Sequence, residues 1–130
     1  YTSILPNVIC KEVEDALNKT KAPIMYLCNV VTQPGETDGF TVSDHVKLIN
    51  KYLDKKKIDT VIASNTKIDK KIAEKYSTAE QKELVTIDYD ALKELGVELI
   101  EDDLVIVENN ILRHNSLKLS SLIFSYLMRK

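Results

Sequence analysis

The stretch IMYLCNVVTQPGETDGFTVSDH, residues 24–45, decides the fold. It opens with an apolar run from Ile24 to Val31 that is rich in β-branched and aromatic residues and follows Pro23. Such a run is typical of a strand buried inside a parallel sheet. Polarity switches at Thr32, where a loop begins in which nearly every side chain can form hydrogen bonds. Because open α/β sheets bind ligands at the carboxyl ends of their strands, this loop is the first candidate for a binding site.

A helix is expected directly after the loop. Apolar residues recur there at the spacing of one helix face: Val42, Val46, Ile49 and Leu53. Thr41 and Asp44 fit a capping box at the start of that helix. Within the loop, Pro34, Gly35 and Gly39 shape the backbone. The stretch therefore predicts a strand, a shaped polar loop and a helix.

The rest of the chain alternates helical and strand-like patterns. Helices are expected over 3–17 with Ser3 as the cap, and over 69–76, 88–95 and 116–127. Further strands are expected over 58–65, 84–87, 97–100 and 104–107. This alternation is typical of a doubly wound α/β fold. We therefore expect residues 1–130 to form a single domain segment with a three-layer, Rossmann-like architecture and a mostly parallel sheet.

Composition excludes several functional classes. Hydrophobic residues make up 44% and charged residues 29% of the chain, with a net charge of −2, as in an ordinary globular domain. Lys and Glu are interspersed, so neither a nucleic-acid footprint nor a membrane patch is indicated. No apolar run approaches the roughly 20 residues that a membrane-spanning helix needs. Cys10 and Cys28 lie in apolar patterns and are expected to be buried free thiols of a cytoplasmic protein.

The polar loop also carries a family resemblance. The run CNVVTQPGETDG, residues 28–39, with Ser43-Asp44-His45 after it, resembles the signature of the gluconeogenesis factor (YvcK-like) family. That family is a branch of the CofD-like superfamily, which contains 2-phospho-L-lactate transferase. The runs YTSILPN at 1–7 and ILRH at 111–114 resemble the same family, so the resemblance covers the whole chain. Members of the family are longer and carry a glycine-rich phosphate-binding turn that is absent here, so we expect the C-terminal part of a larger doubly wound CofD/YvcK-like domain.

The resemblance implies a bacterial, cytoplasmic factor that binds a nucleotide sugar of the UDP-N-acetylglucosamine type. It would act in gluconeogenic carbon metabolism and in control of the cell wall and cell shape, as a binding factor more than as a catalyst. Two other classes stay open: a transferase of the 2-phospho-L-lactate transferase type with a nucleotide-activated donor, and a structural fragment. A homo-oligomeric state is also compatible with the sequence. Neither a nucleophile–base pair nor a Ser/His/Asp arrangement is visible in it.

Polar residues at the ends of the first two buried strands are the candidates for ligand contact. Amides and hydroxyls at such places can read the edge of a base or the hydroxyls of a sugar, or they can tie down their own loop. The candidates are Asn29, Thr32, Gln33, Thr37, Asp38 and Asn65. If the two strands are parallel neighbours, Asn65 should line one concavity with the loop.

Arg113 is the candidate for the phosphate end of the site. It lies just before the last helix, where a guanidinium can grip a phosphate bidentately beside the helix N–H groups. The alternative is a surface salt bridge. Ser116 is expected to cap that helix and is a candidate regulatory phosphorylation site. The resembled family commonly has Asp where Asn115 stands, which puts an acid–base role at that position in doubt.

Two other groups invite a binding interpretation. Asp38, Asp44 and His45 suggest a metal, yet Asp44 and His45 are adjacent on a helix and point in different directions. No metal held by protein side chains alone is expected. The metal site that stays possible is a Mg²⁺ held jointly by Asp38 and the ligand's phosphates. The lysine run at 55–57 is interpreted as a solvated helix end rather than as a phosphate patch.

Overall fold

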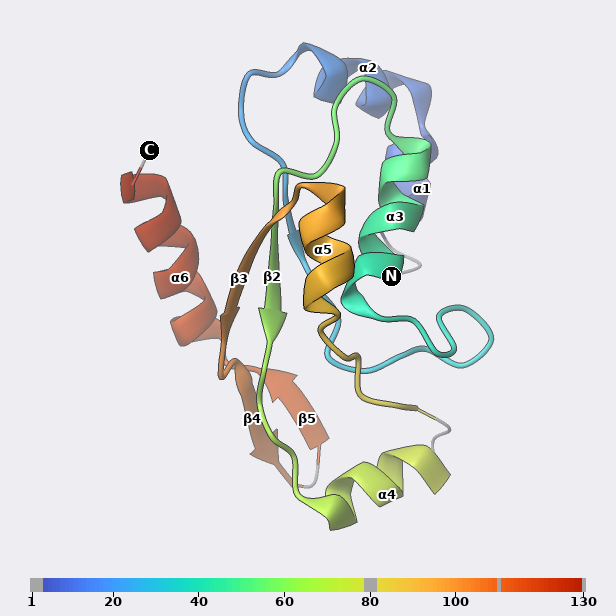
Figure 1. The fold of residues 1–130 in the computed structure, drawn as a ribbon, viewed down its shortest axis with the longest axis vertical. Coiled ribbons are helices and arrows are strands. Elements are labelled where there is room, and N and C mark those ends of the chain that lie inside the picture. Colours follow the sequence, from blue (N-terminus) through green and yellow to red (C-terminus); the bar gives the residue numbers. More distant parts are fainter. Residues whose placement is uncertain (1–3, 79–81, 110, 130) are drawn as a thin grey trace.

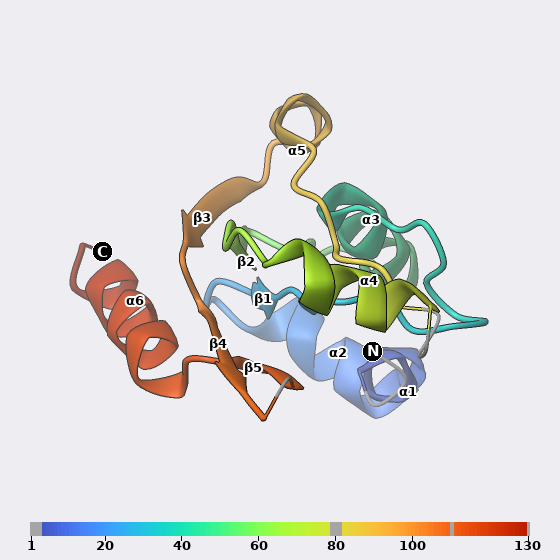
Figure 2. The same cartoon turned by 90° about the horizontal axis from the view of Figure 1, so that it is seen from below.

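The computed structural model describes residues 4–78, 82–109 and 111–129. Its main sheet has three parallel strands in the order β1-β2-β3: β1 (Met25–Leu27), β2 (Thr60–Ser64) and β3 (Glu98–Asp102). Two helices, α3 (Val42–Tyr52) and α5 (Tyr89–Leu95), cover one face, and α6 (Ser116–Arg129) lies on the other (Figures 1 and 2). The expected three-layer, Rossmann-like α/β architecture is confirmed.

The core lies between the sheet and α3. Val46 and Ile49 of α3 pack with Tyr26 of β1 and Val61 of β2, and all four are buried. The capping box starts this helix as expected, because the Thr41 hydroxyl accepts from the Asp44 N–H and the Asp44 carboxylate accepts from the Thr41 N–H. The strand–loop–helix order predicted for residues 24–45 is therefore present, although its strand is shorter than the apolar run.

The chain leaves the sheet soon after β1. Strand β1 ends at Leu27, and Val31 then forms an antiparallel bridge with Leu84. The Val85 N–H donates to the Val30 carbonyl at 2.9 Å. The strand expected over 84–87 is therefore wrong: this segment pairs with the loop that follows β1 and not with the parallel sheet. Apolar content alone could not distinguish the two partners.

The first helical pattern forms two helices, α1 (Leu5–Ile9) and α2 (Lys11–Lys19), so the single helix expected over 3–17 is wrong. Cys10 breaks it with an extended backbone (ψ 123°). Val8 of α1 reaches the core, whereas α2 buries none of its residues. Ser3, the expected cap, lies outside the described residues.

The two cysteines differ in their environments. Cys10 is exposed, contrary to expectation, and its thiol donates to the Glu12 carboxylate at 3.1 Å. Cys28 is buried as expected, and burial raises the pKa of its thiol to about 12. Cys28 is therefore an inert core residue at neutral pH.

The lysine run 55–57 supports the end of α3. The Lys57 ammonium donates to the carbonyls of Asn50 and Leu53, at 2.7 and 2.8 Å. These carbonyls belong to the last turn of the helix, where a cation is favoured by the dipole. The interpretation as a helix end therefore holds for Lys57.

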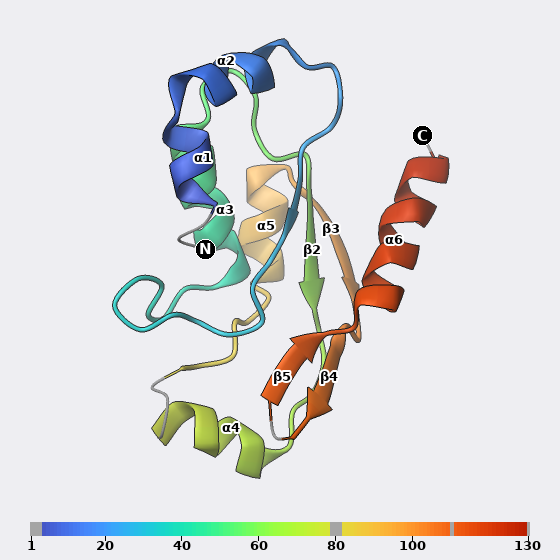
Figure 3. The same ribbon diagram turned by 180° about the vertical axis from the view of Figure 1, so that it is seen from behind.

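A hairpin projects from the carboxyl edge of the sheet (Figure 3). Its strands are β4 (Val105–Glu108) and β5 (Ile111–His114), paired antiparallel, and α4 (Lys70–Thr78) lies near the same end. Strand β5 was missed in the sequence, although Asn109 between two apolar runs was a signal. Its φ of 50° suits an Asn turn residue. No helix in the described part of the chain is both long and apolar enough to cross a bilayer.

Helix α6 is anchored by one aromatic residue. Tyr126 is 2% exposed and its hydroxyl accepts from the Thr60 hydroxyl of β2 at 3.1 Å. The guanidinium of Arg129 lies 5.3 Å from the centre of the Tyr126 ring. The apolar residues at helical spacing in this segment predict one buried face of Leu119, Leu122, Ile123, Tyr126 and Leu127, yet Leu127 is 56% exposed. The face of α6 that packs on the sheet is therefore narrower than the apolar pattern predicts.

Replacing Tyr126 with phenylalanine should lower the free energy of unfolding by about 1 kcal/mol, because the buried Thr60 hydroxyl loses its acceptor. Urea denaturation measures the change. Phe124→Leu, on the exposed side of the same helix, is the control and should stay within about 0.5 kcal/mol of the parent. Equal effects of the two substitutions would show that the Thr60–Tyr126 bond does not anchor the helix.

Candidate functional site

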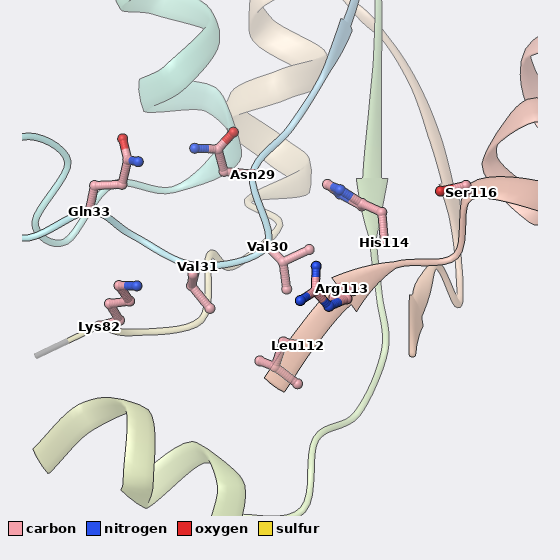
Figure 4. Close-up of a pocket in the computed structure, with 9 residues that line it drawn as sticks. All are labelled: Asn29, Val30, Val31, Gln33, Lys82, Leu112, Arg113, His114 and Ser116. Atoms are coloured by element: carbon pink, nitrogen blue, oxygen red, sulfur yellow. The ribbon is translucent and has the colours of Figure 1, made fainter. Parts of the chain in front are cut away.

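An open pocket of about 470 Å³ lies between the loop after β1 and the hairpin (Figure 4). One wall comes from the loop and Lys82, and the other from β5 and the start of α6. The lining residues are Asn29, Val30, Val31, Gln33, Lys82, Leu112, Arg113, His114 and Ser116. The pocket therefore joins segments that are far apart in the sequence.

The charged side chains that line this pocket, among the described residues, are cationic. Lys82 and Arg113 contribute cationic groups, His114 adds an imidazole, and α6 begins at Ser116. Among the described residues that line the pocket, none is acidic. Cations together with a helix N-terminus favour an anionic ligand such as a phosphate.

Two hydrogen bonds between Thr32 and Glu83 hold the neighbouring Lys82 at the pocket. The Thr32 N–H donates to the Glu83 carbonyl at 2.8 Å, and the Thr32 hydroxyl accepts from the Glu83 N–H at 3.0 Å. These two bonds fix the chain next to Lys82 beside the loop after β1. Sequence reasoning missed Lys82, because no local pattern predicts a contact between residues 51 positions apart, such as Thr32 and Glu83.

The base of the hairpin positions Arg113. Its strand pairs with β4 so that Arg113 lies opposite Ile106 and His114 opposite Val105. The Asn115 N–H then donates to the Leu104 carbonyl at 2.6 Å. Ion pairs within the described residues join Lys118 to Asp102 and Arg129 to Glu98, so the salt-bridge alternative for Arg113 finds no support there.

Asn115, and not Ser116, caps α6. Its side-chain oxygen accepts from the Lys118 N–H at 3.2 Å, while Ser116 is the first residue of the helix. The expectation that Ser116 is the cap is therefore wrong by one residue. Both Asn and Ser make good caps, and the backbone turn at Asn115 decides between them. Ser116 still lines the pocket at the helix N-terminus.

Three of the expected ligand contacts lie together in the pocket: Asn29, Gln33 and Arg113. Thr32 and Thr37 do not line it, because both are buried. The Thr37 hydroxyl accepts from the Gln33 N–H at 2.7 Å. These two threonines therefore hold the loop in shape, which is the alternative that the sequence left open.

Asp38 also acts within its own loop. Its carboxylate accepts from the Gly35 N–H at 2.7 Å, and Gly35 has a φ of 79° that favours glycine. Asp38 is not among the described residues that line the pocket. The position of Asp38 therefore does not support a Mg²⁺ shared between its carboxylate and the phosphates of a ligand in this pocket.

Asn65 lies in a different concavity, so the expectation that it lines one site with Asn29 is wrong. Its side-chain N–H donates to the Glu101 carboxylate at 2.9 Å. Residues 84–87 line a hollow together with Asn65, and their first two pair with Val30 and Val31. This segment therefore lies between Asn65 and the loop after β1, although β1 and β2 are parallel neighbours.

The Ser43-Asp44-His45 run is structural. Asp44 serves the capping box, and His45 is buried with its Nδ1 2.8 Å from the Thr41 carbonyl. Burial lowers the pKa of His45. Within residues 4–78, 82–109 and 111–129 no three His, Cys, Asp or Glu side chains gather as they would around a metal ion.

Residues 1–105 match the sequence model of the family described as 2-phospho-L-lactate transferase CofD. The chain belongs to the CofD family. Its similarity to gluconeogenesis factors is equally direct. A putative gluconeogenesis factor of Clostridium acetobutylicum is 37% identical over 130 residues, and the gluconeogenesis factor of Bacillus subtilis is 39% identical over 127. The resemblance stated from the residues is therefore confirmed.

The chain is shorter than these relatives. It is covered completely by the match to the Clostridium protein and to 98% by the match to the Bacillus subtilis protein, yet spans only 29% and 40% of their lengths. A crystal structure from Bacillus halodurans is similar with a TM-score of 0.89 and 38% identity, over 95% of this chain and 40% of that one. A second, described as a member of the UPF0052 family from the same organism, has a TM-score of 0.87.

Proposed function

We propose that this member of the CofD family binds a nucleotide sugar of the UDP-N-acetylglucosamine type and acts as a binding factor in gluconeogenic carbon metabolism and cell-shape control. The observation that carries the proposal is the cationic pocket, which Lys82 lines on the side of the loop and Arg113 lines near the N-terminus of α6 (Figure 4). A diphosphate carries the charge that such a pocket favours. The relatives named gluconeogenesis factors support the role in gluconeogenic carbon metabolism. A cytoplasmic location follows as part of the same proposal.

Two amides supply the means to select the rest of the ligand. Asn29 and Gln33 line the pocket on the loop side, across from Arg113 (Figure 4). The side-chain oxygen of Gln33 is buried and has no hydrogen-bond partner among the described residues. Buried polar atoms are nearly always paired. The amides of Asn29 and Gln33 are the kind of group that pairs with the hydroxyls of a sugar or the edge of a base.

The competing function is transfer of a phospho-acyl group from a nucleotide-activated donor. The family description supports it, and His114 beside Arg113 gives the pocket a group able to carry a proton. Incubation with a nucleotide-activated phospholactate and a deazaflavin acceptor separates the two functions. Release of nucleotide would establish the transferase, and its absence together with nucleotide-sugar binding would establish the binding factor.

Calorimetric titration tests the binding itself. It is made on this chain and on a chimera in which the chain replaces the matching 40% of the Bacillus halodurans protein. UDP-N-acetylglucosamine should bind with saturation, and uridine, which has no phosphate, should bind far more weakly. Equal binding of the two, or no binding by either protein, would remove the proposal.

Glutamate in place of Ser116 should weaken nucleotide-sugar binding several-fold. Its carboxylate would stand at the start of α6 inside the pocket and compete with the ligand's phosphates for Arg113. The matched control is Ser120→Glu, which adds the same charge one turn later on an exposed position. Titration of both variants decides; an unchanged affinity in Ser116→Glu would argue against a regulatory phosphorylation there.

A further inference from the structure

Strand β3 lies at one end of the main sheet (Figure 2), and within the described residues no strand pairs with its outer edge. The Glu98 N–H donates to the Asp59 carbonyl at 3.0 Å, so the backbone groups of Glu98 face β2. Backbone groups alternate in direction along a strand, so those of Leu99 and Glu101 point outward. Such a row of outward N–H and C=O groups is a template for another strand.

The side of this edge that faces α6 is hollowed. The ion pair between Glu98 and Arg129 places Glu98 on the α6 side, and Ile100 lies on the same side because side chains alternate along a strand. An open groove of about 370 Å³ lies there, with Ile100 in one wall and Leu122 and Tyr126 of α6 in the other. The two ion pairs between β3 and α6 neutralise the carboxylates on this side. An apolar side chain therefore suits the groove.

The opposite side of the edge, which faces α5, is acidic. The Glu101 carboxylate accepts from the Tyr89 hydroxyl of α5 at 2.8 Å, which places Glu101 on that side. Asp103, directly after β3, lines an open hollow of about 610 Å³ together with Glu101. Lys67 is the cation among the described residues that line this hollow. Two carboxylates against one ammonium leave an acidic surface beside the edge, which favours a cationic partner.

We propose that the outer edge of β3 binds an extended segment of a partner protein in which basic and apolar residues alternate. The backbone of the segment pairs with that of Leu99 and Glu101. Its apolar side chains enter the groove along α6, and its basic side chains face Glu101 and Asp103. A second copy of this chain fits less well, because two-fold pairing of Leu99 with Glu101 puts Glu98 opposite the other copy's Asp102. None of these residues lines the cationic pocket, so the proposal is independent of nucleotide-sugar binding.

Amide hydrogen exchange with a synthetic octapeptide of alternating lysine and valine tests the pairing. At a peptide concentration of about ten times its Kd, exchange of the Leu99 and Glu101 amides should slow about tenfold. The Glu98 amide, already bonded to Asp59, should change little. The control peptides have the same lysines and valines in two separate blocks, or glutamate in place of lysine, and neither should protect the edge.

The same exchange measurement can overturn the proposal in two ways. No protection by the alternating peptide, or equal protection by the block peptide, would show that the edge does not recognise this pattern. Protection of Leu99 and Glu101 that needs no peptide and grows with protein concentration would overturn it in favour of a second copy.

A pair of variants at Glu101 gives an independent readout. Glu101→Pro removes the outward N–H, and proline is tolerated on an edge strand where its nitrogen faces solvent. Glu101→Val is the matched control, because it lacks the same carboxylate but keeps the N–H. Fluorescence anisotropy with the labelled alternating peptide should show roughly tenfold weaker binding by the proline variant than by the valine variant. Equal binding by the two variants would contradict backbone pairing at this edge.

A second pair leaves β3 itself unchanged. Ser125→Lys places a cation in the groove between β3 and α6, and should weaken binding of the alternating peptide several-fold. Ser120→Lys adds the same charge at an exposed position of α6 that does not line the groove, and should bind as the parent does. Parent-like binding by Ser125→Lys would show that the groove takes no part in the docking and would overturn the proposal.

Discussion

Replacing Arg113 with alanine is expected to weaken the binding of UDP-N-acetylglucosamine by roughly ten- to a hundred-fold. The guanidinium lines the pocket one residue before the turn at Asn115, which the Leu104 carbonyl and the cap of α6 hold in place. Hydrogen bonds to charged groups contribute about 1.5–3 kcal/mol, and each 1.4 kcal/mol is a tenfold change in affinity. The loss should appear in calorimetric titrations of both the chain and the chimera.

Lysine at this position should not restore the affinity. An ammonium keeps the charge but cannot form the planar pair of bonds that a guanidinium makes with a phosphate. Lys118→Ala is the charge-matched control, since Lys118 pairs with Asp102 and does not line the pocket. If Arg113→Ala binds as tightly as the parent, or no worse than Lys118→Ala, the phosphate end of the site has been placed wrongly.

Replacing Asp88 with alanine should lower the free energy of unfolding by about 3 kcal/mol. Its carboxylate accepts from the Thr41 hydroxyl at 2.8 Å, from the Ser43 N–H at 2.9 Å and from the Ser43 hydroxyl. Asp88 also directly precedes α5, so these bonds join the starts of α3 and α5. Without the carboxylate, the buried Ser43 hydroxyl loses its acceptor. We take the sum of three charge-assisted bonds as about 3 kcal/mol because such bonds are not additive.

The pH dependence of stability provides the second half of this test. Burial raises the pKa of Asp88, but the bonds from Ser43 and Thr41 outweigh it and hold the pKa below its usual value. A lowered pKa in the folded state stabilises the protein fully above the unfolded value of about 3.9, and that contribution is lost as the pH falls through the folded pKa. Asp88→Asn should therefore flatten the acid limb of the stability curve.

Denaturant melts from pH 7 to pH 3 on the parent and on Asp88→Asn measure both effects. Asp90→Asn is the matched control, because Asp90 is an exposed carboxylate two residues further along. A parent-like acid limb in Asp88→Asn, or a loss in Asp90→Asn of the same size, would contradict a structural role for the carboxylate.

The sequence by itself determined the features that depend on neighbouring residues. The capping box of Thr41 and Asp44 forms because both partners lie within one helical turn. Gly96 ends α5 with a φ of 71°, because a glycine at this position adopts the left-handed conformation without help from distant residues. The order of strand, polar loop and helix, and with it the α/β class, follows from the period of apolar residues in each segment. The family resemblance likewise rests on a continuous run, residues 28–39.

Only the tertiary structure decided which polar residues share a pocket. Thr32, Thr37 and Asn65 are as polar as Asn29 and Gln33, yet two of them are buried in the loop and the third faces Glu101. The pairing of residues 30–31 with 84–85 separates Asn65 from the loop and at the same time places Lys82 beside it. Such long-range hydrogen bonds leave no periodic trace, because they join two irregular segments whose own residues would suit several partners. The break at Cys10 likewise left no trace in the helical period, although Val8 before it is buried in the core and the helix after it buries none of its residues.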